Sequence, residues 1–357
     1  MLRHHASGTA GIPRRTILKA GAAAGALVAA PFVRTASAQE KTLYVNTWGG
    51  VWEQSAKKHI FDPFTRDTGV EIRTVSPVSF AKLAAQTRSG VYEFDVTTLG
   101  AAEIMRANDA KLIEPIEGAP IDASKLWKGA VFLNGVGFDC FATVIAYRAD
   151  RFPNGGPQSW ADFWNVERFP GTRSLQRYAG RILPLALLAD GVPVDKLYPL
   201  DLPRAFASLN RIKPHVRVWW TQGQQSQQLL RDGEVDMIGI WQGRVFELID
   251  QGHPIRMTWN QAEIDKGYWV VAKGTPRRDI AWRFIESACD PERQANFARD
   301  ALTSPVNPKA FAFIGGKDAE RMATAPANYP QAFEQDILNF GGDLQDQTRR
   351  FEQWIAS

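Results

Sequence analysis

The sequence predicts an α/β protein with two lobes joined by extended crossing segments and a ligand cleft between the lobes. Two observations support this fold class. Strand-like and helix-like stretches alternate along most of the chain, which is typical of sheets flanked by helices. The 357-residue chain is also longer than one hydrophobic core usually organises, so its length favours two lobes.

Three strand–helix pairs near the start predict the sheet of the first lobe. Apolar and β-branched stretches predict strands at residues 43–47, 70–75 and 94–98. Helical spacing predicts helices at residues 52–68, 80–88 and 101–108. Gly69 and Gly90 each end one of these helices. Strict alternation of strand and helix predicts a parallel sheet.

A long strand-like stretch from Gly135 to Arg148 then interrupts the alternation and is predicted to cross between the lobes. Ser159 is predicted to cap a short helix in which Trp160 and Trp164 fill the core. Further strands are expected near residue 174 and at residues 216–219, 235–241, 255–259 and 267–272. Further helices are expected at residues 181–189, 202–212, 224–231 and 245–251. The remainder of the chain is predicted to be mainly helical.

The N-terminus is interpreted as an export signal. Arg14 and Arg15 precede a weakly apolar run that ends at Ala36-Ser37-Ala38, a small-x-small cleavage site, and this arrangement resembles the twin-arginine signal. The run is too short to span a membrane, which takes about 20 apolar residues. An uncleaved anchor or a disordered tail is the alternative. The signal predicts a periplasmic protein.

The signal also accounts for the basic charge of the whole chain. Residues 1–38 hold five of the 42 basic residues and no acid, so 37 basic and 38 acidic residues remain, a net charge of −1. This balance gives no reason to expect nucleic acid or an anionic membrane as a partner. We predict a mature chain with lobe 1 at residues 39–142 and 268–313, and lobe 2 at residues 143–267 and 314–357.

Few residues of the sequence are typical of a catalytic, metal or cofactor site. Cys140 and Cys289 are far apart and are interpreted as buried free thiols, with a disulfide as the alternative. The three histidines after the signal lack metal-ligand spacing, and no nucleophile elbow, P-loop or dinucleotide motif is present. Asp236 is interpreted as a structural hydrogen-bonding acid. We therefore predict no enzyme, no metal and no cofactor, with a periplasmic enzyme on this fold as the alternative.

Ligands of open α/β sheets bind beyond the carboxyl ends of the strands. These ends are predicted at residues 48–50, 98–100, 176–178, 219–221 and 241–243, and four of the five carry an aromatic side chain. Trp48 and Trp241, both close to glycines, are expected to face the cleft. The sequence therefore favours a binding site with aromatic walls.

Several segments carry a resemblance to a known family. They are Val45–Trp48, Phe94–Val96, Ser159–Trp164 with Phe169–Gly171 after it, and Gly233–Trp241. In their order and spacing, the chain resembles the extracellular solute-binding proteins of spermidine/putrescine-type ABC importers. The resemblance covers essentially the whole mature chain. It implies the two-lobed periplasmic-binding-protein fold of type II, closure on a small ligand, and a membrane permease as partner.

The resemblance also implies a pocket in which aromatic faces and carboxylates hold a polyamine. Trp48, Trp241, Tyr268 and Trp269 supply the aromatic part. Arg177, Arg181 and Trp269 align with the positions where polyamine binders carry acids. Arginine repels an ammonium group and pairs with a carboxylate, so we predict a carboxylate-bearing amine such as γ-aminobutyrate. Opine-like and phosphonate ligands would also use arginine, and a polyamine is the alternative.

The predicted ligand-binding residues follow from the strand ends and this alignment. They are Trp48, Gly49, Thr98, Arg177, Tyr178, Arg181, Trp220, Trp241, Arg244, Tyr268 and Trp269. Arg244, just past Trp241, is expected to add positive potential. The chain is expected to act as a monomer.

Overall fold

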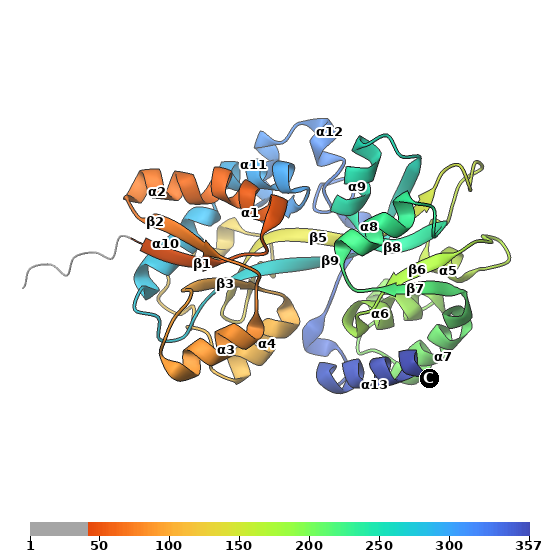
Figure 1. Cartoon of the computed structure of the whole chain (residues 1–357), viewed down its shortest axis with the longest axis horizontal. Coiled ribbons are helices and arrows are strands. Elements are labelled where there is room, and N and C mark those ends of the chain that lie inside the picture. The colour runs from red at the N-terminus through yellow and green to blue at the C-terminus, as the bar shows by residue number, and fades with distance from the viewer. Residues whose placement is uncertain (1–41) are drawn as a thin grey trace, which may run out of the picture. The chain divides into compact units, whose positions relative to one another are not determined.

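The computed structural model describes residues 42–357, and the predicted export signal lies outside the described residues. Within the described part, eleven strands form one mixed sheet with helices around it, as the predicted α/β class requires (Figure 1). The central order of the sheet is β2-β1-β3-β9-β5-β8-β6-β7.

The first group of strands is parallel, as predicted. It consists of β1 (Thr42–Asn46), β2 (Glu71–Val75) and β3 (Val96–Leu99). The helices of this part are α1 (Gly50–Ala56), α2 (Asp62–Thr68), α3 (Phe80–Ser89) and α4 (Ala101–Asp109). A π-helical turn, Lys57–Phe61, joins α1 to α2, so the predicted helix over 52–68 has three parts. Gly69 and Gly90 adopt left-handed φ angles of 72° and 73° and end α2 and α3, as predicted.

Two long strands join the halves of the sheet. The strand β5 (Gly135–Arg148) has the predicted bounds, and it pairs with β9 (Ile255–Val271) in antiparallel register. The prediction of two separate strands at 255–259 and 267–272 is wrong, because the polar residues between them continue the pairing with β5. Both strands run between the two groups of shorter strands (Figure 1). Two predicted lobe boundaries, after residues 142 and 267, fall within these two strands, and the third, after residue 313, follows a 3-10 turn. The lobe boundaries stay a prediction.

The second group of strands is also parallel. It consists of β6 (Arg173–Gln176), β7 (Val216–Trp220) and β8 (Met237–Trp241). Its helices are α5 (Trp160–Trp164), α6 (Ala179–Ala189), α7 (Leu202–Ile212), α8 (Gly223–Arg231) and α9 (Gln242–Asp250). Ser159 caps α5, and Trp160 is fully buried, as predicted. Asp236 accepts hydrogen bonds from the backbone and hydroxyl of Thr172, which confirms its structural role.

The C-terminal part is less helical than predicted. Its main helices are α10 (Arg278–Ala288), α11 (Pro291–Ala301) and α13 (Leu344–Ala356). Between α11 and α13 lie β10 (Ser304–Pro305), α12 (Gly316–Ala319), β11 (Phe333–Glu334) and three 3-10 turns. The strand β10 pairs with β5, as β4 (Val131–Phe132) does, while β11 pairs with β9, so the crossing strands gain further hydrogen-bonded neighbours.

Two large hydrophobic clusters form most of the core. One includes Val45, Phe138 and Trp269, and the other includes Trp160 and Leu183. Cys140 and Cys289 are free thiols, as predicted, but only Cys140 is fully buried, while Cys289 is partly exposed. Desolvation still raises the pKa of Cys289 to about 12. Within residues 42–357, no helix has the length and apolar character to cross a membrane.

Candidate functional site

The carboxyl ends of several strands carry predicted ligand-binding residues. Trp48 and Gly49 follow β1, and Gly49 has a φ angle of 74°, a conformation that suits glycine at the start of α1. The Trp48 side chain is exposed, at 53%. Thr98 lies at the end of β3 and is buried, and its hydroxyl has no hydrogen-bond partner among residues 42–357. Trp48 therefore offers an open aromatic surface, while Thr98 offers an unused buried hydroxyl.

Arg181 joins α6 to both crossing strands. One terminal nitrogen, Nη1, lies 3.2 Å from Thr143 Oγ1 on β5 and 3.3 Å from Glu263 Oε2 on β9. The other, Nη2, lies 2.5 Å from Asp265 Oδ2. The side chain is only 4% exposed. We call Arg181, Thr143, Glu263 and Asp265 the Arg181 cluster.

Aromatic rings flank the Arg181 cluster. The guanidinium carbon of Arg181 lies 5.1 Å from the ring centroid of Phe141 and 5.8 Å from that of Tyr178. The ring of Phe141 in turn meets that of Trp241 edge to face at 6.0 Å. Since Tyr178 follows β6 and Trp241 is the last residue of β8, these two predicted strand ends lie close to the crossing strands. Such rings provide faces for the alkyl part of a ligand and for a cation.

The charged side chains of the Arg181 cluster are costly to bury. Burial raises the pKa of Glu263 to about 8, although Arg181 acts in the opposite direction. Burial also raises the pKa of Tyr178 to about 12. Arg181 Nε is buried and has no hydrogen-bond partner in the described part of the chain. The cluster therefore keeps one unused donor beside two carboxylates.

Trp241 and Arg244 lie close to the start of α8. A side chain at Gly223 would come within 2.8 Å of the Trp241 ring and 3.1 Å of Arg244 Nε. Arg244 is paired with Glu247 at 3.2 Å and is partly exposed. Trp241 Nε1 is a buried donor without a partner in residues 42–357. Trp241 thus contributes a ring and a free N–H, whereas the charge of Arg244 is already balanced.

Arg177 lies apart from the Arg181 cluster, four residues away in sequence. Its guanidinium binds Glu352 on α13, and both side chains are about 40% exposed. Glu352 raises the pKa of the Arg177 guanidinium through this hydrogen bond. The structure therefore gives Arg177 a surface ion pair and places Arg181 at the crossing strands.

Three predicted aromatic ligand contacts lie in the core instead. Trp220 is fully buried, and its indole N–H donates to the carbonyl of Gly239 at 2.9 Å. Trp269 is fully buried among other aromatic rings, including that of Trp52 at 5.7 Å. Tyr268 is 4% exposed and points toward the cluster that includes Ile104. These three side chains pack in the hydrophobic core and are not among the proposed ligand contacts.

The sequence did not predict the acidic residues near Arg181 as part of the site. Glu263, Asp265 and Asp139 lie on β9 and β5, and no motif marks them. The polar residues that gather at positions 260–266 of β9 are a sequence signal that could have identified these acids. Within the described part of the chain, no group of three or more histidine, cysteine or acidic side chains is placed to hold a metal ion.

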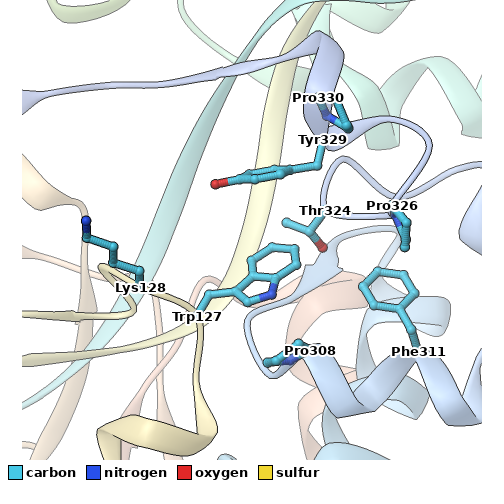
Figure 2. A pocket seen from close by; sticks show the side chains of 8 residues that line it. All are labelled: Trp127, Lys128, Pro308, Phe311, Thr324, Pro326, Tyr329 and Pro330. Atoms are coloured by element: carbon cyan, nitrogen blue, oxygen red, sulfur yellow. The ribbon is translucent and has the colours of Figure 1, made fainter.

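A cavity of about 350 Å³ lies beside the crossing strands (Figure 2). The rings of Trp127 and Tyr329 face it, 5.2 Å apart, together with Phe311 and three prolines. Tyr329 donates to Glu334, which binds Lys266. Because Lys266 and Asp265 are consecutive on β9, they project to opposite faces, so this cavity is separate from the Arg181 cluster.

Comparison with known proteins assigns the family. Residues 59–329 match the model of the bacterial extracellular solute-binding proteins. The γ-aminobutyric acid-binding protein of Pseudomonas aeruginosa is 33% identical over 91% of this chain and 94% of its own length. The spermidine/putrescine-binding periplasmic protein of Escherichia coli is 23% identical over 69% of this chain and 70% of its own length.

Solved structures agree with this match. An ABC transporter substrate-binding protein from Bradyrhizobium japonicum has a TM-score of 0.81 and 33% identity over 88% of this chain and 99% of that chain. A GABA receptor has a TM-score of 0.82 and 30% identity over 88% of this chain and 98% of that chain.

The fold and the family match thus define a solute-binding protein of the periplasmic-binding-protein type. The chain belongs to the bacterial extracellular solute-binding protein family, as the sequence resemblance predicted. Its relatives are substrate-binding proteins of ABC transporters rather than enzymes.

Proposed function

We propose that this chain captures γ-aminobutyrate, or a closely related amino acid with separated charges, in the periplasm. It delivers the ligand as a monomer to the membrane permease of an ABC importer. The Arg181 cluster carries the proposal, because it combines a buried guanidinium with carboxylates at the crossing strands. A ligand that holds both a carboxylate and an ammonium group complements such a mixed site.

Two further observations support a zwitterion over a diamine. The unused Nε donor of Arg181 suits a carboxylate and gives nothing to an ammonium group. The rings of Phe141, Tyr178 and Trp241 suit a short alkyl chain between the two charges. Relatives of 33% and 30% identity are named for γ-aminobutyrate binding or reception.

A polyamine is the second candidate, because the acids on β5 and β9 outnumber the single guanidinium of the cluster. Calorimetry on the purified mature chain separates the two candidates. The panel contains γ-aminobutyrate, putrescine, spermidine and an opine. We expect γ-aminobutyrate to bind at least about tenfold more tightly than putrescine, a difference of about 1.4 kcal/mol. Tighter binding of putrescine or spermidine would replace the proposal with the polyamine function.

A further inference from the structure

Asp139 lies on β5, two residues before Phe141, and it has no assigned role. The residue is 7% exposed. Its Oδ2 accepts a hydrogen bond of 3.0 Å from the indole N–H of Trp52 on α1. The Trp52 ring is held by edge-to-face contacts with Phe138, Trp269 and Phe297. The Asp139 carboxylate is therefore buried and fixed in position.

Asp139 differs from the other buried acids in lacking a cation. Asp95 pairs with Arg277, Glu114 pairs with Lys273, and Glu263 pairs with Arg181. No lysine, arginine or histidine in residues 42–357 forms an ion pair with Asp139. Burial raises the pKa of Asp139 to about 6, and the nearby charge of Asp265 adds to this effect. A buried carboxylate without a counter-charge is costly, so an external cation would relieve the cost.

Asp139 projects toward the same site as the Arg181 cluster. In the register of β5 and β9, Phe141 lies opposite Asp265, and Asp139 lies opposite Gly267. Alternate residues of a strand share one face, so Asp139 and Asp265 are diagonal neighbours beside the ring of Phe141. Diagonal positions are about 7–8 Å apart. Because Asp265 binds Arg181, the Asp139 carboxylate lies one diagonal position away from the acid that holds the cation of the cluster.

The glycine opposite Asp139 leaves space for the carboxylate. A Cβ atom at Gly267 would lie 2.2 Å from Asp139 Oδ1. Any side chain at position 267 would therefore displace the Asp139 carboxylate or be displaced by it.

We propose that Asp139 is the residue that receives the ammonium group of the ligand, while Arg181 Nε donates to the ligand's carboxylate. This inference rests on the proposed function and deepens it. It assigns recognition of the amine to a carboxylate that Trp52 positions, and it makes Asp139 the determinant that separates an ω-amino acid from an uncharged analogue of the same length.

The test measures the affinities of two proteins, the wild type and Asp139→Asn, for two ligands. Asp139→Asn keeps the size of the side chain and an oxygen that accepts from Trp52, but it removes the charge. The ligands are γ-aminobutyrate and 4-hydroxybutyrate, in which a hydroxyl replaces the ammonium group. We expect the variant to lose at least about 30-fold in affinity for γ-aminobutyrate. Its affinity for 4-hydroxybutyrate is expected to change by less than about threefold.

A merely structural aspartate would give another pattern. Loss of a structural contact would weaken the binding of both ligands to the same extent. It would also lower the midpoint of thermal unfolding of the ligand-free protein. Removal of an unpaired buried charge should instead raise that midpoint. Equal losses for both ligands, or unchanged binding of γ-aminobutyrate, would overturn the assignment of Asp139.

Gly267→Ala is the second variant, because its new methyl group collides with Asp139 Oδ1 and leaves the charge in place. It should also weaken the binding of γ-aminobutyrate more than that of 4-hydroxybutyrate, and an equal effect on both affinities would contradict the proposal.

If the wild type binds putrescine rather than γ-aminobutyrate, the proposed function fails. The role of Asp139 is then tested by measuring the affinities of the wild type and of Asp139→Asn for putrescine and for 4-amino-1-butanol. A wild type that binds no amine overturns both proposals.

Discussion

Arg177 and Arg181 show how two similar residues acquire different roles. Arg177 directly follows β6, Arg181 lies four residues later in α6, and the sequence analysis predicted both as ligand contacts. Arg177 precedes α6 and binds Glu352 at the surface, whereas Arg181 lies in the first turn of α6 and binds acids on β9. The helix therefore selects which arginine becomes buried.

Neutral substitution of the two arginines should separate these roles. Arg181→Met leaves Glu263 and Asp265 without their cation, and we expect the free energy of unfolding to fall by about 3 kcal/mol. Arg177→Met breaks an exposed pair that water screens, so its effect on stability should be much smaller. Urea unfolding of both variants measures the difference. Similar losses for the two variants would contradict the role of burial.

Glu263 should make the stability depend on pH. Its pKa rises from an ordinary 4.5 to about 8 in the folded state, because burial disfavours the charged form. The folded state thus binds the proton more tightly, and this stabilisation is full below about pH 4.5 and disappears as the pH rises through 8. Glu263→Gln should lose less stability than the wild type between pH 5 and pH 8, measured by thermal unfolding. Glu352→Gln, at an exposed position, is the control and should follow the wild type.

At the scale of the element, β9 explains the main error in the predicted strands. Residues 260–266, Asn-Gln-Ala-Glu-Ile-Asp-Lys, are mostly polar, and only Ala262 and Ile264 among them are apolar. Residues 263–266 nevertheless pair with β5, where Arg181 binds Glu263 and Asp265, and Glu334 binds Lys266. The residues that obscure the strand pattern are those that build the site. Local rules fail most readily at functional positions.

The crossing strand β5 also depends on a close approach of two backbones. A Cβ atom at Gly137 would lie 2.9 Å from the carbonyl oxygen of Ala130. Gly137→Ala should therefore lower the free energy of unfolding by about 1–3 kcal/mol, because backbone atoms must move. Gly316→Ala is the matched control, since no atom lies within 4 Å of its added Cβ. Urea unfolding compares the two, and equal stability would show that β5 adapts without cost.

At the scale of the whole molecule, the two crossing strands predict a hinge. Both β5 and β9 link the β1–β3 group to the β6–β8 group (Figure 1). A ligand that contacts residues on both sides of these strands should stabilise a closed arrangement. Small-angle X-ray scattering should give a smaller radius of gyration with saturating ligand than without it. An unchanged radius at saturation would argue against a hinged clamp.

Several features follow from the amino-acid order alone. The alternation of strands and helices gives the α/β class, and the bounds of β5 and α7 agree with the pattern residue for residue. The glycines after α2 and α3 and the cap at Ser159 act locally, so short sequence windows suffice to find them. The family resemblance is also a property of the order and spacing of motifs.

The composition of the binding site required the folded chain. Arg181 on α6, Asp139 on β5 and Asp265 on β9 are distant in sequence and meet through the pairing of the two crossing strands. Trp269 and Trp220 are both fully buried in the core, and Trp220 donates its indole N–H to the carbonyl of Gly239. Burial and charge pairing depend on which elements pack together, and this long-range packing decides which arginine, which acids and which aromatic rings reach a ligand.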